Sequence, residues 1–267
     1  MEIKLIVSDL DGTLLTNKKT ISEYNKQMIR TVKEKGIKFC IASGRPYKSI
    51  QQIINKNRLD DLVDYIIGYN GYILLDIDKN YSFTEEKLSV DEIEEIIAIT
   101  RNDNFNVIQY DGDELYALYE DNVTKRIETY KPCKCHIIGV DFFNKPLEKI
   151  LITNDISILN QFYQRHKMDN KSYKMVKGNT DLIEFMKNNI SKGKTLLKLL
   201  EYSGINSNQV LAFGDQDNDL ELLDSIKYSV AMGNSEQHIK DVCWSTCLTN
   251  EENGVGSFID EFIIESK

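Results

Sequence analysis

The sequence has few cysteines, no long apolar run and no excess of positive charge. Its five cysteines are an odd number in a chain of 267 residues, which argues against a framework of disulfides. No apolar stretch approaches the roughly 20 residues of a membrane-spanning helix, and no basic-then-apolar leader precedes the first strand pattern. We therefore expect a cytoplasmic protein.

The charge balance is acidic. The 33 lysine and arginine residues are outnumbered by 42 aspartates and glutamates, which gives a formal net charge of -9. This balance argues against broad binding to nucleic acid or to an anionic membrane surface. With 41% hydrophobic and 28% charged residues, the composition is that of a globular protein of one or two domains.

The order of apolar patterns predicts an α/β protein. Strand patterns over residues 3–8 and 37–42 alternate with helical patterns, which is typical of a parallel sheet covered on both faces. From about residue 72 the pattern changes to short strands and helices of an α+β kind, and the first alternation returns near residue 186. We predict a parallel-sheet core domain of residues 1–78 and 186–267, with an α+β domain of residues 79–185 inserted into it.

Two carboxylates stand two residues apart where the first predicted strand ends. Because strand side chains alternate with period two, Asp9 and Asp11 can point into one small space at the carboxyl end of the strand. Such crowding either raises one pKa or calls for a cation, and both are typical of catalytic sites. Gly12 lets the backbone turn away, and Thr13 adds a hydroxyl and an amide.

Three further segments follow predicted strands or begin predicted helices. Residues 41–45 offer the Ser43 hydroxyl and backbone amides at a helix N-terminus, which is a good anion site. Residues 190–194 place Lys192 and a second lysine at another helix start, and residues 213–219 form an acidic loop after an apolar strand. Open parallel sheets bind ligands at this edge. Together the segments supply carboxylates, a hydroxyl, an ammonium group and amides.

Each segment alone also has an ordinary structural explanation. A solvated acidic turn, a helix cap at Ser43 and a solvated lysine at Lys192 would leave the same residues in place. Gly193 to Thr195 end like a nucleotide-binding loop, but the glycine required five residues earlier is Asn188. The joint occurrence of the four segments in this order favours a functional site.

In this order, the four segments resemble the motifs of the haloacid dehalogenase superfamily, most closely its Cof-type phosphatases. The resemblance covers essentially the whole chain, since the long gap between Ser43 and Lys192 matches the large type-2 cap insertion of that family. It implies a Rossmann-like core with an inserted α+β cap. It also implies Mg²⁺-dependent hydrolysis of small phosphorylated metabolites, such as sugar or cofactor phosphates, through an aspartyl-phosphate.

The resemblance further implies a role for each matched residue. Asp9 is expected to be the nucleophile, and Asp11 the general acid/base. The expected phosphate-binding residues are Leu10, Thr13, Ser43, Gly44, Lys192 and Asn218. The expected Mg²⁺ ligands are Asp9, Asp11 through its backbone carbonyl, Asp215 and Asp219. Arg45, at the rim of the site, is expected to contact the substrate.

Two alternatives remain open at this point. A phosphotransferase or phosphomutase of the same chemistry would pass the phosphoryl group to a hydroxyl instead of water. A non-enzymatic phosphorylated signalling domain also uses an aspartate at a strand end, an acidic pair and a lysine. Asp11 and the large insertion argue against that second alternative, because an acid/base two residues after the nucleophile promotes turnover.

Overall fold

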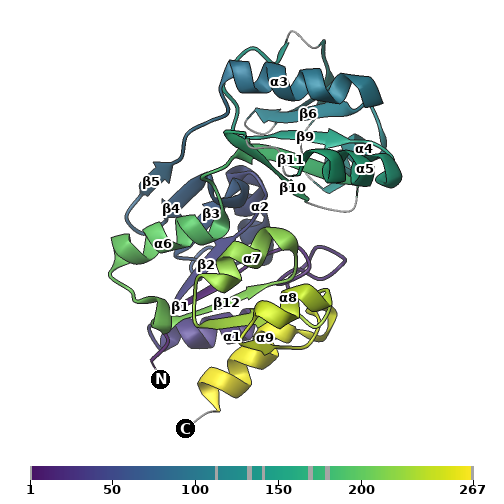
Figure 1. Cartoon of the computed structure of the whole chain (residues 1–267). Helices are drawn as coiled ribbons and strands as arrows, with labels where there is room; N and C mark the ends of the chain where they lie inside the picture. The colour runs from purple at the N-terminus through teal and green to yellow at the C-terminus, as the bar shows by residue number, and fades with distance from the viewer. Residues whose placement is uncertain are drawn as a thin grey trace. The chain divides into compact units, whose positions relative to one another are not determined.

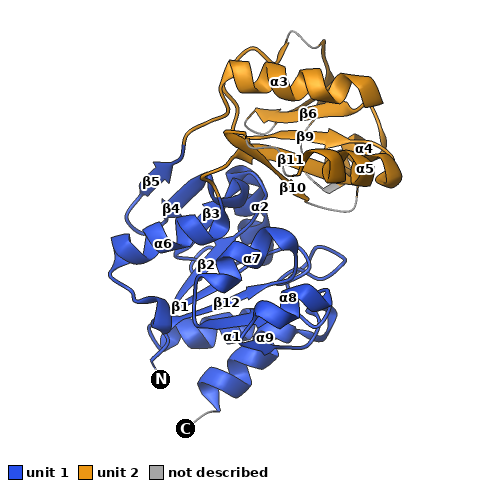
Figure 2. Ribbon diagram, viewed as in Figure 1, with its two compact units in different colours: residues 1–85, 191–267 blue, residues 86–190 orange. Residues whose placement is uncertain are grey.

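The chain folds into two units, which Figure 2 distinguishes by colour. The first unit comprises Met1–Glu85 and Ser191–Lys267, and the second comprises Glu86–Ile190. The computed structural model describes residues 2–111, 114–130, 134–139, 142–167, 171–177 and 181–265. None of the helices in these ranges is both long and apolar enough to cross a membrane.

The first unit is built on a sheet that is mainly parallel. Within the described residues the sheet has eight strands in the order β14-β13-β12-β1-β2-β3-β4-β5 (Figure 1). The parallel strands are β1 (Leu5–Ser8), β2 (Lys38–Ala42), β3 (Tyr65–Gly68), β12 (Val210–Gly214), β13 (Tyr228–Ala231) and β14 (Ser245–Thr246). Two antiparallel strands, β4 (Ile73–Asp76) and β5 (Tyr81–Thr84), extend one edge.

Helices cover both faces of this sheet, because its strands carry apolar residues on both faces. In β1, Ile6 packs in one apolar cluster and Leu5 and Val7 pack in another. Residues of α1 (Glu23–Glu34), α2 (Tyr47–Asn57) and α9 (Gly254–Ile259) belong to the first cluster, and residues of α6 (Lys192–Ser203) and α7 (Leu220–Asp224) belong to the second. The short helix α8 (Gln237–Val242) contributes Ile239 to a small satellite cluster.

The second unit is an α+β domain with a mostly antiparallel sheet. Within its described residues the strand order is β10-β11-β9-β6-β7-β8. The strands are β6 (Asn106–Asp111), β7 (Glu114–Ala117), β8 (Cys135–Ile137), β9 (Ile150–Thr153), β10 (Tyr173–Lys177) and β11 (Leu182–Lys187). The cluster that holds most of its core residues includes residues of α3 (Val90–Thr100) and α5 (Ile156–His166), and a separate cluster includes Val123 of α4 (Asn122–Tyr130).

The predicted fold class is confirmed, and the two junctions differ from the predicted boundaries. Residues 79–85 were expected in the inserted domain, but β5 pairs with β4 and so extends the sheet of the first unit. Residues 186–190 were expected in the core, but β11 continues to Lys187, and the Asn188 amide donates to the Ser172 carbonyl at 3.0 Å. Backbone pairing therefore moves both junctions later in the chain.

Candidate active site

Three carboxylates meet at the carboxyl-terminal edge of the core sheet. Asp9 follows β1, while Asp215 and Asp219 follow the neighbouring strand β12. One oxygen from each of the three side chains lies within 4.8 Å of the other two. All three residues are buried, with exposed fractions of 5%, 7% and 1% in the order named. In the part of the chain that the structure describes, they are the only such group of three potential metal ligands.

Two glycines allow these carboxylates to approach one another. Gly12 has a φ of +82°, and a Cβ atom there would lie 2.2 Å from Oδ2 of Asp215. A Cβ atom on Gly214 would lie 2.6 Å from the Cβ atom of Asp219. A larger side chain at either position would push an aspartate out of the cluster, so both glycines are part of the site.

Lys192 is the cation of the cluster. It is the first residue of α6, whose N-cap Ser191 accepts a hydrogen bond from the Lys194 amide at 3.1 Å. Lys192 is fully buried, and its Nζ lies 2.6 Å from Oδ1 of Asp9 and 2.6 Å from Oδ1 of Asp219. Burial opposes the charged form, but the carboxylates of Asp219 and Asp9 outweigh it and raise the pKa of Lys192. The ammonium group therefore remains charged.

With all its side chains ionised, the cluster would carry more negative than positive charge. Burial raises the pKa of Asp9 well above its usual range; Lys192 opposes this rise, whereas Asp219 and Asp215 add to it. Burial and the Asp219 carboxylate raise the pKa of Asp215 to about 7, although Thr13 Oγ1 donates to Asp215 Oδ1 at 2.9 Å. One ammonium group does not compensate three buried carboxylates. A hard divalent cation with oxygen ligands fits this set of donors.

Asp11 lies outside the three-carboxylate cluster and is held by two cations. Arg45 binds it with both Nε and Nη2, at 2.5 Å and 2.7 Å, and Lys19 Nζ lies 2.7 Å from Oδ1. Burial would raise the pKa of Asp11, but Arg45 and Lys19 outweigh it and hold the pKa well below its usual range. The Asp11 side chain is still 31% exposed, so a substrate can reach it.

The remaining predicted site residues form a chain of contacts between two loops. The Ser43 hydroxyl accepts a hydrogen bond from the Arg45 amide at 3.2 Å. Asn218, in the short 3₁₀ helix η5 (Asp217–Asp219), donates through Nδ2 to Oδ1 of Asn70 at 3.1 Å. A Cβ atom on Gly44 would lie 2.8 Å from the same Asn70 oxygen. The segments around Ser43 and Asn218 therefore meet at Asn70.

Some contacts of the site were not expected from the sequence. The side chain of Leu10 is fully buried in the core, and the predicted contact of its backbone amide with phosphate remains a prediction. Lys19 and Asn234 were not predicted to take part, yet Lys19 binds Asp11 and Asn234 Nδ2 donates to the Gly12 carbonyl at 2.9 Å. Lys19 lies in a turn far from any strand end, so the patterns used for the other residues could not find it, whereas Asn234 follows β13 (Tyr228–Ala231) and its position after a strand was a usable signal.

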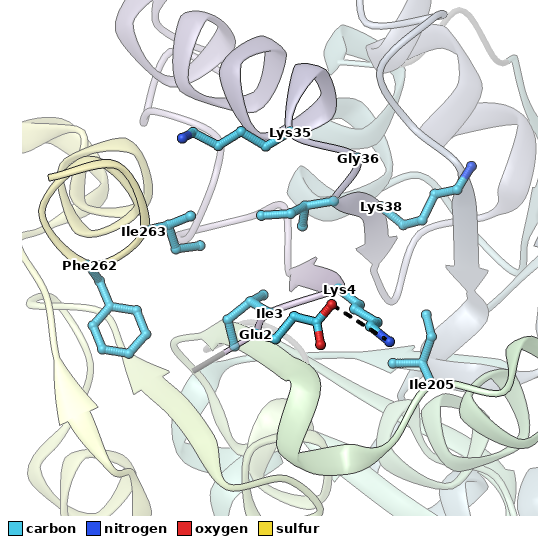
Figure 3. Close-up of a pocket in the computed structure, with 10 residues that line it drawn as sticks. Glu2, Ile3, Lys4, Lys35, Gly36, Lys38, Ile205, Phe262 and Ile263 are labelled. Atoms are coloured by element: carbon cyan, nitrogen blue, oxygen red, sulfur yellow. Dashed lines mark ion pairs between the residues drawn. The ribbon is translucent and has the colours of Figure 1, made fainter. Parts of the chain in front are cut away.

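A cavity of about 830 Å³ lies at the opposite edge of the core sheet (Figure 3). It is lined by residues that precede or begin β1 and β2, among them Lys4 and Lys38, and by apolar side chains such as Phe262. Lys38 is bound by Asp64 at 2.6 Å and by Asp78 at 3.2 Å. Because the aspartate cluster follows the carboxyl ends of the same strands, this cavity is not part of the candidate active site.

Comparison with known proteins gives a family and several full-length relatives. A sequence model of the haloacid dehalogenase-like hydrolases matches residues 6–259. A 5-amino-6-(5-phospho-D-ribitylamino)uracil phosphatase of Bacillus subtilis is 29% identical over 272 residues, which cover 98% of this chain and 99% of that protein.

Solved structures share the fold over nearly the whole chain. A haloacid dehalogenase-like hydrolase from Bacteroides thetaiotaomicron is 27% identical, with a TM-score of 0.85 over 98% of this chain and 100% of that chain. The HAD subclass IIB sugar phosphatase BT4131 is 18% identical, with the same TM-score over 97% and 98% of the two chains. At that lower identity the likeness shows the fold alone.

Proposed function

This chain belongs to the haloacid dehalogenase-like hydrolase family and is a phosphatase, and we propose that it hydrolyses small phosphate monoesters through a phosphorylated Asp9. The observation that carries the proposal is the buried cluster of Asp9, Asp215 and Asp219 beside Lys192. A folded protein does not keep uncompensated carboxylates buried for stability alone. The cluster is therefore best explained by a ligand of positive charge.

We infer that Mg²⁺ is this ligand and that Asp9, Asp215 and Asp219 hold it. Their donor atoms are all carboxylate oxygens, which suit a small hard cation, and the backbone carbonyl of Asp11 is the further ligand that the family resemblance implies. When bound, the ion lets an anionic nucleophile approach an anionic phosphate and neutralises charge on the phosphoryl oxygens.

The residues of the chain then divide the chemistry between them. A carboxylate oxygen of Asp9 attacks phosphorus, and the bond from phosphorus to the leaving oxygen breaks while that oxygen takes a proton from Asp11. Water next attacks the phosphorus of the aspartyl-phosphate and gives a proton to Asp11. The bond from phosphorus to Asp9 breaks, and inorganic phosphate leaves. Lys192 keeps its positive charge beside Asp9 throughout.

The ion pairs of Asp11 affect its protonation both when the aspartyl-phosphate forms and when water hydrolyses it. Arg45 and Lys19 favour its ionised form, which is the form that accepts a proton from water in the second step. Proton donation in the first step requires these ion pairs to loosen, because two cations on one carboxylate keep its pKa low. The side chains of Ser43 and Asn218 and the Gly44 amide are the proposed contacts of the phosphoryl oxygens.

We propose small phosphorylated metabolites, such as sugar or cofactor phosphates, as the substrates. A similar protein, matched over 99% of its own length, is named for the dephosphorylation of a phosphorylated ribityl compound. We also retain the prediction of a cytoplasmic enzyme. The free thiols of Cys40, Cys243 and Cys247 are compatible with that compartment.

The test is hydrolysis of p-nitrophenyl phosphate by the wild-type protein and by Asp9→Asn. Loss of the attacking oxygen should lower kcat at least about 10³-fold with the fold intact, since an amide does not replace a carboxylate nucleophile. Asp61→Asn is the matched control, because Asp61 is an exposed residue of the same unit. Normal activity in Asp9→Asn would remove the nucleophile from the proposal. A separate screen of phosphorylated metabolites for phosphate released by the wild-type protein would identify the substrate.

A further inference from the structure

We propose that Asn70 is a positioning residue that fixes the side-chain amide of Asn218, so that an N–H of Asn218 is presented to the phosphoryl group. The proposal rests on the proposed function, since it takes Asn218 as a phosphate contact. Asn70 is only 4% exposed, and its Oδ1 accepts a hydrogen bond from Asn218 Nδ2 at 3.1 Å. Asn218 itself is only partly buried.

The backbone at Asn70 is held in an unusual conformation, from which its side chain reaches Asn218. Asn70 lies in the short 3₁₀ helix η1 (Tyr69–Gly71), and its φ of 55° and that of Tyr69, 50°, are both left-handed. Two hydrogen bonds fix this unusual backbone to the phosphate-binding segment: the Asn70 amide donates to the Ser43 carbonyl, and the Tyr69 amide donates to the Arg45 carbonyl, each at 3.0 Å. A conformation that costs free energy and is held in this way is typical of functional sites.

The chemistry of the contact determines which way the Asn218 amide faces. The Asn70 Oδ1 atom can only accept, so the amide nitrogen of Asn218 must face it, and not the amide oxygen. An NH₂ group carries two hydrogens, and the contact with Asn70 uses one of them. The other hydrogen is available for a phosphoryl oxygen. Without Asn70, the Asn218 amide could flip and present its oxygen, which would repel that ligand.

The nature of residue 70 also fits this role. Asparagine is one of the few residues that adopt a left-handed conformation readily. Aspartate would supply an acceptor in the same conformation, but it would add a buried carboxylate beside Asn218, one residue from the carboxylate of Asp219. A neutral acceptor at this position therefore orients Asn218 without opposing an anionic substrate.

The test compares two replacements of asparagine by glycine. Glycine tolerates a positive φ, so Asn70→Gly removes the acceptor and keeps the backbone conformation. Asn80→Gly is the matched control, since Asn80 also has a left-handed φ, 49°, lies in the same unit and is exposed. The measured quantities are the inhibition constant of inorganic phosphate, the kinetics with p-nitrophenyl phosphate and the midpoint of urea unfolding.

Asn70→Gly should raise the inhibition constant of phosphate roughly tenfold, the loss expected for one hydrogen bond to a charged ligand, while Asn80→Gly leaves it unchanged. A positioning role also predicts coupling: in an Asn218→Ala background, Asn70→Gly should change that constant by less than about twofold. The proposal would be overturned if the effects of Asn70→Gly and Asn218→Ala on the inhibition constant of phosphate were additive. It would also be overturned if Asn70→Gly left that constant unchanged.

A second variant covers the case in which Asn70→Gly does not fold. Asn218→Ala, at a partly exposed position, should by itself raise the inhibition constant of phosphate by about the same factor. No change in Asn218→Ala would overturn the proposal without touching the proposed function, because wild-type hydrolysis of p-nitrophenyl phosphate tests that function separately.

Discussion

The two units of the chain differ in how their buried carboxylates are neutralised. In the second unit the carboxylate of Glu184, which is 9% exposed, pairs with the Lys149 ammonium group at 2.7 Å. Glu92 of the same unit binds Lys187 at 2.9 Å and accepts further hydrogen bonds from Ser89 and Ser172. Each buried carboxylate of these pairs has its own cation.

The first unit contains both kinds of buried carboxylate. Asp64, directly before β3, is 1% exposed and is matched by Lys33 and Lys38 at 2.7 Å and 2.6 Å. At the carboxyl edge of the same sheet, the ammonium group of Lys192 binds Asp9 and Asp219, while the third carboxylate, Asp215, accepts a hydrogen bond from the neutral hydroxyl of Thr13. A buried carboxylate that is paired with a lysine needs only a structural role to account for it. An excess of buried carboxylates over cations instead indicates a positively charged ligand from outside the chain.

The largest expected effect falls on the chemistry of Asp11. Asp11→Asn removes the proposed proton donor, so it should lower kcat/KM for an alkyl phosphate roughly 10³-fold. For p-nitrophenyl phosphate the loss should be much smaller, because nitrophenolate leaves without protonation. The measurement is kcat/KM for both substrates in the wild type, in Asp11→Asn and in the exposed control Asp61→Asn. Equal losses on the two substrates would show that Asp11 is not the acid.

A smaller effect is expected from breaking a matched pair in the second unit. Glu184→Gln leaves the buried Lys149 without its carboxylate, which should destabilise the chain by about 3 kcal/mol. Glu120→Gln is the control, because Glu120 pairs with Lys125 at the surface, where such a pair contributes less than about 1 kcal/mol. Urea unfolding of the full chain measures both changes. Equal midpoints for the two variants would mean that the buried pair does not contribute as proposed.

The smallest expected effect is the change with pH in the free energy by which Glu92 stabilises the fold. Burial would raise its pKa, but hydrogen bonds from Ser172 and Lys187 outweigh burial and lower the pKa to about 2. Because the folded pKa lies below the ordinary value, the ionised Glu92 stabilises the fold above that value, and the stabilisation is lost as the pH falls towards 2. Glu92→Gln should therefore cost on the order of 2 kcal/mol at pH 7 and progressively less below pH 4.5.

Hydrogen exchange of the α3 amides at pH 7 and at pH 3 measures this difference. Glu94→Gln, an exposed position on the same helix, is the control and should show no such change with pH. A loss of protection in Glu92→Gln that is the same at both pH values would contradict the assignment.

Most of the fold follows from local patterns in the sequence. The predicted strand patterns over residues 3–8 and 37–42 contain β1 (Leu5–Ser8) and β2 (Lys38–Ala42), and the predicted helix start near Lys192 is the first residue of α6. The position of β5 could not be predicted in the same way, because whether a short strand joins one sheet or the other depends on its pairing with β4.

The same distinction applies to the site. Asp9, Lys192 and Asp215 stand next to strands or a helix start, so the topology of the sheet brings them together. Lys19 reaches Asp11 from a turn in which its own φ is 57°, a conformation that no periodic pattern predicts. The pairing of Arg45 with Asp11 was likewise not expected, and the predicted contact of Arg45 with substrate remains a prediction.

We propose that the three buried carboxylates of Asp9, Asp215 and Asp219 form a metal site. The most direct measurement is the unfolding midpoint of the wild type and of Asp215→Asn, each with EDTA and with Mg²⁺. Mg²⁺ should stabilise the wild type by about 3 kcal/mol at a hundredfold excess over its Kd. With EDTA, Asp215→Asn should be at least as stable as the wild type, because it removes a repelling carboxylate, and Mg²⁺ should no longer stabilise it. Equal stabilisation of both proteins by Mg²⁺ would show that Asp215 does not hold the ion.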